Sequence, residues 1–373
     1  MLRLAIRNLF QSKARLLITA GGVSLSLLLI LTLDAIFQGV EMQVSAYIDQ
    51  SEADVFVAQE GVRNMHMASS SLPAGVAAQV QAIPGVASVT PILYVTNVVA
   101  IGDSRNVAYV IGLPADAQAG GPARLIEGHA PPGPGEALID RSIAAKSGIG
   151  MGDEVKILGR WFTIGGLSTG TVNLVSSVAF ISMQDFRDAR GGSDAVSFLL
   201  IRSEKGLSPA DLAARIESQV GGVTAQPTTA FAAQERRVIR DMSTDLIAIM
   251  NLVGLLIGLA VMALTTYTAS LARRAEYGVL KALGAQNRDL MKTVFLQAML
   301  SVALGFAVGL ALTFVLAAVV PLTGVNLLLL VTGTSLLKVG TISLLIAGAS
   351  AVLPVIQIGR LDPALVFRGG TGR

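Results

Sequence analysis

The chain has 373 residues, of which 52% are hydrophobic and only 14% charged, and its mean hydropathy is +0.64. This composition excludes an ordinary soluble protein. The formal net charge is +3, and the absence of cysteine excludes both a disulfide framework and a thiolate metal site.

Four apolar stretches are long enough for membrane-spanning helices, which need about 20 residues each. They cover 16–37, 246–271, 293–322 and 339–358. Residues 325–337 are also apolar, but Lys338 follows them, and we therefore assign 323–338 to a short outer loop.

The first apolar stretch follows basic residues, as the core of a secretory signal peptide does. It is 22 residues long and no small-residue cleavage site follows it, whereas a signal core has about 7–15 residues. We therefore expect an uncleaved anchor. Residues 1–15 predict an amphipathic helix on the cytoplasmic surface, because Leu2, Ile6 and Leu9 share one face.

Basic side chains gather in three segments, 1–15, 272–292 and 359–373, which the positive-inside rule places in the cytoplasm together with both termini. Residues 38–245 then lie outside the membrane. Residues 38–242 carry a net charge of −5 and the rest of the chain +8, so the basic balance reflects membrane orientation. We expect contact with a lipid bilayer and no nucleic-acid binding.

The outer segment alternates strand-like and helix-like patterns, which predicts an α+β domain inserted between the first and second membrane helices. Two subdomains are expected, one from 52–115 with 195–228 and the other from 116–194. The expected strands cover 54–58, 86–100, 106–113, 152–167 (two strands around Gly159), 178–182, 195–202 and 223–226. The expected helices cover 73–83, 137–147, 183–189 and 208–220, and a further helix runs from Thr229 into the second membrane stretch.

Motifs for chemistry are few. The sequence contains no G-x-x-x-x-G-K-[ST] phosphate loop, no H-E-x-x-H and no G-x-S-x-G, so no enzymatic activity is predicted. Met65, His66 and Met67 form one cluster whose thioether and imidazole groups suit copper or haem. The alternative is a surface loop in which the methionines pack, and no metal or cofactor is predicted for this chain.

Small and charged residues in the membrane stretches suggest packing contacts. Gly254 and Gly258, like Gly305 and Gly309, are four residues apart, a spacing that lets helix backbones approach closely, either within one chain or between two copies. Asp34 and Lys338 lie near helix ends, where a charge either marks a substrate path or reaches water and headgroups.

The polar segment 273–292 predicts a helix from Arg273 to Leu283 that Gly284 terminates. Tyr277, Leu280 and Leu283 share an apolar face of this helix. Composition leaves two readings open: a basic interfacial helix that fixes the topology, or a helix that docks on a cytoplasmic partner.

Ala275–Ala285, which read AEYGVLKALGA, closely resemble the motif after the second membrane helix in FtsX-like, MacB-type ABC transporter permeases. Arg7–Arg15, Gly135–Ile157 and Leu361–Gly370 resemble other parts of that family, so the resemblance covers nearly the whole chain. Because no fused ATPase precedes the first membrane stretch, the chain resembles the separate-permease members, such as the DevC, LolC and HrtB types.

The resemblance implies that the helix in 273–284 is a coupling helix that binds a separate cytoplasmic ABC ATPase, and that ATP and Mg are bound by that partner. It assigns the coupling contact to Arg273, Glu276, Tyr277, Leu280, Lys281, Leu283 and Gly284. It also implies a permease homodimer and mechanotransmission, in which ATP-driven motion reaches the outer domains.

The resulting hypothesis is a multi-pass permease of the bacterial cytoplasmic (inner) membrane that exports a hydrophobic or amphipathic substrate. An extracytoplasmic adaptor is a further candidate partner. Two alternatives stay open: a signal relay that regulates an extracytoplasmic partner without transport, and a plain membrane scaffold.

Overall fold

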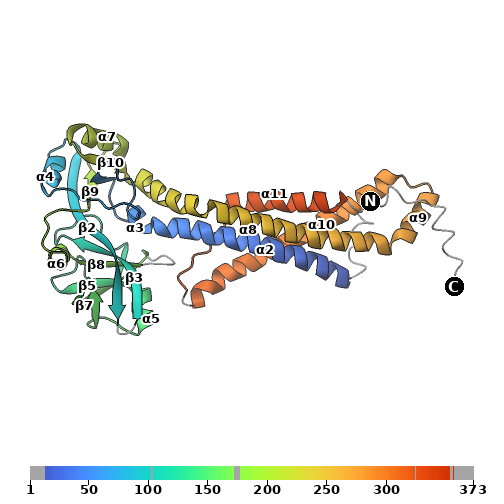
Figure 1. The fold of residues 1–373 in the computed structure, drawn as a ribbon, viewed down its shortest axis with the longest axis horizontal. Coiled ribbons are helices and arrows are strands. Elements are labelled where there is room, and N and C mark those ends of the chain that lie inside the picture. Colours follow the sequence, from blue (N-terminus) through green and yellow to red (C-terminus); the bar gives the residue numbers. More distant parts are fainter. Residues whose placement is uncertain (1–12, 102–103, 172–176, 324, 353–355, 357–373) are drawn as a thin grey trace. The chain divides into compact units, whose positions relative to one another are not determined.

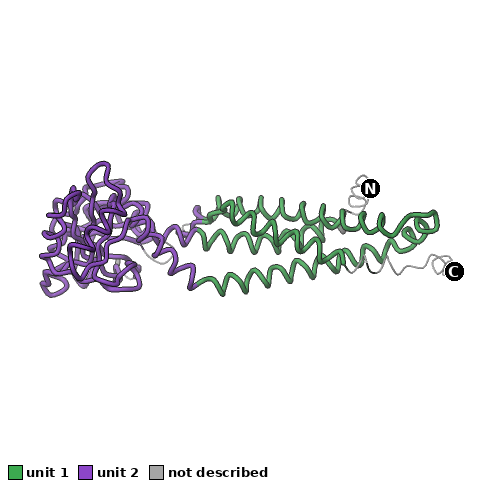
Figure 2. Tube along the Cα trace, turned by 90° about the horizontal axis from the view of Figure 1, so that it is seen from above, with its two compact units in different colours: residues 1–38, 243–320, 329–373 green, residues 39–242, 321–328 purple. Residues whose placement is uncertain are grey.

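The computed structural model describes the chain except for residues 1–12, 102–103, 172–176, 324, 353–355 and 357–373. The expected amphipathic segment up to residue 12 and the tail from residue 359 therefore lie outside the described residues. The described chain divides into two compact units, coloured separately in Figure 2. Unit 1 comprises 1–38, 243–320 and 329–373, and unit 2 comprises 39–242 and 321–328.

Four described helices are long and apolar enough to cross a membrane, as the sequence predicts. They are α2 (Lys13–Val44), α8 (Thr228–Ala272), α10 (Asn287–Val319) and α11 (Gly333–Ser350), which Figure 1 labels. The short helix α9 (Arg274–Ala282) separates α8 from α10, and the 3-10 turn η1 (Val320–Thr323) follows α10.

The fourth helix begins six residues earlier than expected, at Gly333 instead of 339. Thr332 caps α11 by accepting a hydrogen bond from the backbone N–H of Ser335. Lys338, which led us to extend the outer loop to 338, lies inside the helix and forms an ion pair with Asp34. The charge is therefore compensated within the chain and does not exclude the segment from the helix.

The core of unit 1 is built on α2. Val23, Leu27, Ile30 and Leu31 have no exposed surface. They pack in one cluster with residues of the other three long helices, namely Met262, Ala298, Val302, Val339, Ile346 and Ala347. One face of the first membrane helix thus packs against the other three, while Leu17, Ile18 and Leu25 of the same helix are exposed.

Unit 2 is an α+β domain, as expected, and all its described strands fall between α2 and α8 in the sequence. The strands are β1 (Val55–Gln59), β2 (Val86–Ile101), β3 (Ser104–Leu113), β4 (Arg124–Gly128), β5 (Glu136–Asp140), β6 (Glu154–Ile157), β7 (Arg160–Thr169), β8 (Ser177–Ser182), β9 (Phe198–Ser203) and β10 (Val223–Pro227). The short helices are α3 (Ala46–Asp49), α4 (Gly75–Gln81), α5 (Arg141–Ser147), α6 (Met183–Ala189) and α7 (Pro209–Gln219).

The strands follow the order β10-β1-β9-β2-β3-β8-β5-β7-β4, with β6 paired to β2 and β7. The 16-residue strand β2 belongs to both halves of this sheet, because residues 86–92 pair with β9 and residues 93–101 pair with β3. Strand β3 in turn runs parallel to β8. The expected subdomain boundary at 115–116 is therefore wrong: β3 and the second half of β2 belong with the sheet of the insertion.

The expected helix over 137–147 is also wrong in its first part, where the chain forms β5 before α5 begins at Arg141. Ala137, Leu138 and Ile139 are consecutive and all fully buried, so they occupy both faces of the sheet. Asp140 ends the strand and caps α5 by accepting the backbone N–H of Ser142 at 2.7 Å. Burial raises the pKa of the Asp140 carboxyl above its usual value, and the hydrogen bonds from Ser142 oppose that shift.

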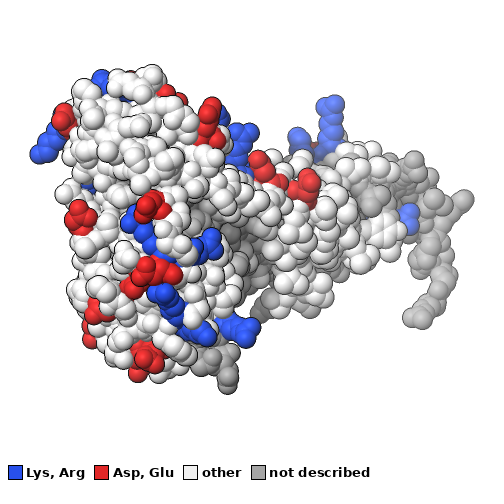
Figure 3. Space-filling model, turned by 60° about the vertical axis from the view of Figure 1, so that its left-hand side comes forward, with Lys and Arg blue, Asp and Glu red and all other residues white. Residues whose placement is uncertain are grey.

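Other expectations are confirmed closely. Helix α6 has the expected bounds, 183–189, and α7 begins with Ser208 as N-cap and Pro209 in the first turn. Strand β4, which the sequence did not reveal, is exposed along its whole length and so lacks the alternation that marks a half-buried strand. On the face of unit 2 in Figure 3, basic and acidic side chains are interleaved without a broad area of one sign.

Phe180 offers a test of this core, because its side chain is fully buried at the centre of β8. We expect Phe180→Ala to destabilise unit 2 by about 3–5 kcal/mol, since the substitution leaves a cavity. Thermal unfolding of the full chain in detergent, with hydrogen exchange at β5 and β8, measures the effect. Trp161→Ala, at a position 59% exposed, is the control and changes stability by less than about 1 kcal/mol.

Candidate functional site

Helix α9 lies in unit 1 between α8 and α10, as the sequence predicts. It ends in a Schellman motif, in which the N–H of Ala285 binds the carbonyl of Leu280 and the N–H of Gly284 binds that of Lys281. Gly284 has a φ of +94°, a left-handed conformation that favours glycine. Gly284 therefore terminates α9 and begins the turn that leads into α10.

The two faces of α9 differ in environment. Tyr277 is only 4% exposed and packs inside the chain with Leu290 and Val294 of α10. Val279, Leu280 and Leu283 are 43%, 37% and 79% exposed. The expected apolar docking face is therefore corrected: Tyr277 anchors α9 to its own chain, and the exposed apolar side consists of Val279, Leu280 and Leu283. Burial raises the pKa of the Tyr277 phenol.

The remaining residues expected at this contact lie on or beside α9. Arg273 precedes the helix as its N-cap, Glu276 is exposed in the first turn, and Lys281 is half-buried in the last. The structure thus brings an apolar strip and charges of both signs together on one short helix, with Tyr277 as the exception that points inward.

The glycines of α8 pack against α2 within the same chain. A Cβ atom at Gly254 would lie 2.5 Å from Ile30, and one at Gly258 would lie 2.8 Å from Ser26. The Ser26 hydroxyl also donates a hydrogen bond to the carbonyl of Gly254. The reverse contact occurs at Gly22 of α2, where an added Cβ atom would lie 2.4 Å from Val261 of α8.

The glycines of α10 pack against α2 as well. A Cβ atom at Gly305 would lie 2.9 Å from Val23, and one at Gly309 would lie 3.0 Å from the backbone oxygen of Ser24. All four predicted glycines therefore face α2 within one chain, in keeping with the intrachain reading of their spacing. Close backbone approach of this kind is a main source of helix association in lipid.

Asp34 of α2 and Lys338 of α11 form an ion pair of 2.7 Å between Oδ1 and Nζ. The Ser335 hydroxyl donates to the other carboxylate oxygen of Asp34. The Asp34 side chain is 8% exposed and that of Lys338 is 40% exposed. Neither a path for substrate nor contact with headgroups is needed to explain the two charges, because they compensate each other.

The Met65-His66-Met67 cluster is split by the fold. Met65 is 2% exposed and packs in a core cluster of unit 2, whereas Met67 is 64% exposed. His66 contacts the buried carboxylate of Glu235 through Nδ1, and the backbone N–H of Met65 donates to the same carboxylate at 2.7 Å. Among the described residues, no group of three His, Cys, Asp or Glu side chains is placed to hold a metal ion. The two methionines therefore lie in different environments, one packed in the core and one exposed.

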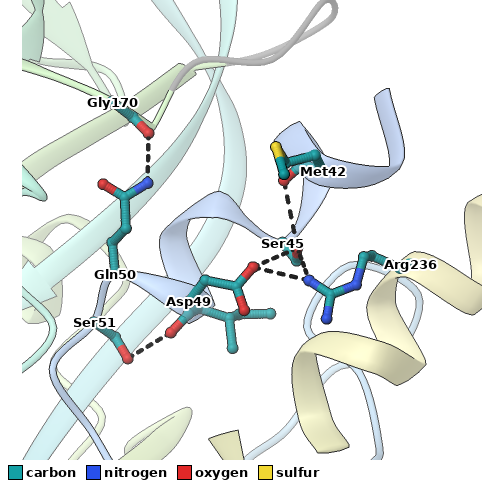
Figure 4. A network of polar contacts seen from close by, with 8 residues as sticks. Met42, Ser45, Asp49, Gln50, Ser51, Gly170 and Arg236 are labelled. Atoms are coloured by element: carbon teal, nitrogen blue, oxygen red, sulfur yellow. Dashed lines mark hydrogen bonds and ion pairs between the residues drawn. The ribbon is translucent and has the colours of Figure 1, made fainter. Parts of the chain in front are cut away.

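Two ion pairs join α8 to the end of α2 and to α3 within unit 2. Arg240 binds Glu41 through two hydrogen bonds, of 2.7 and 3.2 Å. Arg236 reaches Asp49 at 2.9 Å and the Ser45 hydroxyl at 2.6 Å, as Figure 4 shows. The sequence predicts that both arginines lie on one helix. It does not indicate their partners Glu41 and Asp49, which precede them by nearly 200 residues.

Two sequence families match the chain. One is described as the MacB-like periplasmic core domain and covers residues 16–219, which is more than half of the chain. The other, the FtsX-like permease C-terminal domain, covers residues 248–363. The chain belongs to the FtsX/MacB-type permease family. The resemblance seen in the sequence is thereby confirmed.

Relatives of the permease agree with this assignment. Uncharacterized ABC transporter permeases of Mycobacterium bovis and Mycobacterium tuberculosis are 24% identical to it, and each alignment covers 99% of this chain and 100% of the relative. The permease is thus an ABC transporter permease by family and a membrane protein by its four apolar helices.

Two solved structures are similar to part of the permease. The periplasmic region of MacB from Actinobacillus actinomycetemcomitans is 13% identical, with a TM-score of 0.39 over 49% of this chain and 92% of that one. The extracellular domain of the noncanonic ABC-type transporter YknZ from Gram-positive bacteria is 11% identical, with a TM-score of 0.36 over 47% and 100%.

The glycine contacts predict opposite effects for one substitution at two sites. Gly305→Ala places a Cβ against Val23 and is expected to lower stability by about 1–3 kcal/mol. Gly340→Ala in α11 meets no atom of the chain within 4 Å, and alanine's higher helix propensity makes it neutral or stabilising by up to about 1 kcal/mol. Thermal midpoints in one detergent measure both, and equal shifts of the same sign would contradict the intrachain contact.

The Asp34–Lys338 pair predicts non-additive effects. Lys338→Met leaves the buried Asp34 carboxylate without its cation and should cost about 3 kcal/mol of stability. Adding Asp34→Asn should recover most of that loss, because the charge is gone and the amide oxygen still accepts from Ser335. Lys292→Met, at an exposed position, is the control. A double variant as unstable as Lys338→Met alone would argue against the pair.

Proposed function

We propose that this chain is the membrane-spanning permease subunit of an ATP-driven exporter, with ATP and Mg bound by a separate ABC ATPase subunit. The observation that carries the proposal is the exposed apolar strip of Val279, Leu280 and Leu283 on α9, in a chain whose family is that of ABC permeases. The 373 residues contain no phosphate-binding loop, so the proposal assigns hydrolysis to the partner and no cofactor to this chain.

The proposed topology follows from charge. The loop that contains α9 carries five basic and two acidic residues, which favours the cytoplasmic side of the bacterial inner membrane for α9 and for both termini. The α+β domain then lies outside the cytoplasm, inserted between the first and second membrane helices. The match of residues 16–219 to a MacB-like periplasmic core domain supports that side for the domain.

The proposed mechanism is mechanotransmission. ATP-driven closure of the ATPase would displace α9, which Tyr277 anchors to α10. The helix that precedes α9 in the chain, α8, is continuous from Thr228 to Ala272. In unit 2, Arg236 and Arg240 connect that helix to α3 and to the end of α2. A homodimer would supply two such pathways over two ATPases, and large exposed side chains such as Leu256 and Phe314 offer apolar surface for lipid or a second copy.

The proposed substrate is hydrophobic or amphipathic, taken from the outer leaflet or the extracytoplasmic space, with or without an extracytoplasmic adaptor. In liposomes that contain the permease and its ATPase, amphipathic compounds should stimulate ATP hydrolysis. Stimulation by an extracytoplasmic protein alone would instead favour a signal relay.

If α9 binds the ATPase, a substitution on its exposed apolar side should weaken that association without unfolding the permease. Leu283→Glu places a carboxylate in the apolar contact, where burial costs several kcal/mol, so association with the ATPase should weaken at least about tenfold. Membrane insertion and the thermal midpoint should not change, because Leu283 is 79% exposed.

Gln286→Glu adds the same charge at an exposed position beyond the end of α9 and serves as the matched control. Co-purification with the ATPase and ATP hydrolysis are the two readouts. Full association and activity of the Leu283→Glu, Leu280→Glu double variant would overturn the proposed coupling contact.

A further inference from the structure

Unit 2 contains a cavity of about 530 Å³, within the size range of small-molecule sites. Its walls come from four segments: the loop 65–71, residues 93–96 of β2, α6 with Arg190, and residues 193–198 at the start of β9. The β2 segment begins where this strand leaves β9 and starts to pair with β3. The cavity therefore adjoins the junction of the two halves of the sheet.

The lining combines apolar and cationic groups. Leu93, Tyr94, Phe186, Val196 and Phe198 supply apolar and aromatic surface, and Arg187 and Arg190 supply positive charge. Serines and Thr96 supply hydroxyl groups. None of the described residues that line the cavity carries a carboxylate.

The two arginines are three residues apart at the end of α6, a spacing that places them on the same side of the helix. The nearest carboxylates on α6 are engaged elsewhere. Asp185 accepts hydrogen bonds from the Gly135 backbone at 2.9 Å and from the Ser182 hydroxyl at 2.6 Å. Asp188 accepts from the side-chain amide of Gln184 at 2.9 Å.

Neither arginine side chain has a hydrogen bond or an ion pair with another described residue. The Nε atom of Arg187 is moreover shielded from solvent. A shielded guanidinium nitrogen without a partner is unusual, because burial of an unpaired polar group is costly. An anion in the cavity would instead meet the terminal nitrogens of the two guanidinium groups, with the fork geometry that arginine offers to carboxylates and phosphates.

His66, which also lines the cavity, contacts Glu235 through Nδ1, while its Nε2 is shielded from solvent and has no hydrogen-bond partner among the described residues. Its ring lies 4.3 Å from that of Tyr109, measured between centroids, and is fixed by these contacts. Since Glu235 belongs to α8 and is 1% exposed, the wall formed by Met65 and His66 is attached directly to that helix.

We propose that this cavity binds an anionic amphiphile, with a carboxylate or phosphate head on Arg187 and Arg190 and an apolar part against Leu93, Phe186 and Phe198. The inference rests on the proposed function in one respect, since it names the class of substrate that the exporter recognises. A cationic amphiphile would be repelled by the arginines, and a neutral one would form no ion pair with them.

The test uses the full chain in phosphatidylcholine nanodiscs, without ATPase or nucleotide. Four probes with the same chain are compared, namely octanoate, octyl phosphate, octanol and octylammonium, with empty nanodiscs as the background. We expect one or both anions to bind at least about tenfold more tightly than octanol or octylammonium. Hydrogen exchange should slow on binding in residues 65–71 and 193–198.

Arg187→Gln with Arg190→Gln should raise the anion's Kd at least about tenfold. Arg105→Gln, at an exposed position outside the cavity, should leave it unchanged. Arg187→Lys, which keeps the charge, should retain part of the affinity if the double variant's loss reflects charge and not unfolding.

Binding by octyl phosphate alone would identify a phosphate head, and binding by both anions would extend the site to carboxylates. Equal binding of octanol, or unchanged anion binding in the double variant, would overturn the inference. Because the binding test contains no ATPase, a negative result there would not bear on the proposed coupling through α9. A loss of coupling would likewise not bear on the binding result.

Discussion

The contact between α2 and α8 is the interaction on which the rest of the structure depends, and its chemistry changes along the two helices. In unit 1 the helices meet through small residues, with Gly22, Gly254 and Gly258 each facing a side chain of the other helix. In unit 2 the same two helices are joined by the bidentate pair of Arg240 and Glu41, while Arg236 continues the connection to Asp49 of α3. In lipid the hydrophobic effect does not hold helices together, so their association depends on close packing of small residues. Ion pairs can connect the same helices where water surrounds them.

This arrangement gives α2 and α8 different roles. In unit 1 one face of α2 packs against three other helices, so its position is fixed by packing. Helix α8 is continuous over 45 residues and carries the groups that connect to unit 2, including Glu235, Arg236 and Arg240. Helix α8 thus makes contacts in both units, with α2 in unit 1 and with the Met65 loop, α3 and the end of α2 in unit 2.

Much of this fold was predictable from the sequence because its signals are local. Uninterrupted apolar runs located the membrane helices, and Ser208 with Pro209 located the start of α7. Gly284 located the end of α9, since a left-handed residue is needed there. These features depend on residues within a few positions of one another.

The failures have a different physical origin, because they depend on partners that are distant in sequence. Lys338 was placed outside the fourth helix since its partner Asp34 lies 304 residues earlier. The burial of Tyr277 depends on α10, and the periodicity of α9 alone cannot distinguish a face that packs on its own chain from one left exposed. Strand β5 looked helical because a strand buried on both faces shows no alternation.

Hydrogen exchange in the complex of the permease with its ATPase tests the central claim, that the contacts of α8 with α2 and α3 carry motion to unit 2. Addition of a non-hydrolysable ATP analogue should change the exchange of residues 41–51 and 228–241. In the Glu41→Gln, Asp49→Asn variant the ATPase should still bind, but the change in 41–51 should be lost, whereas Asp241→Asn, at a position 69% exposed, should retain it. An undiminished change in 41–51 without both carboxylates, or no change in the unaltered complex, would contradict the account.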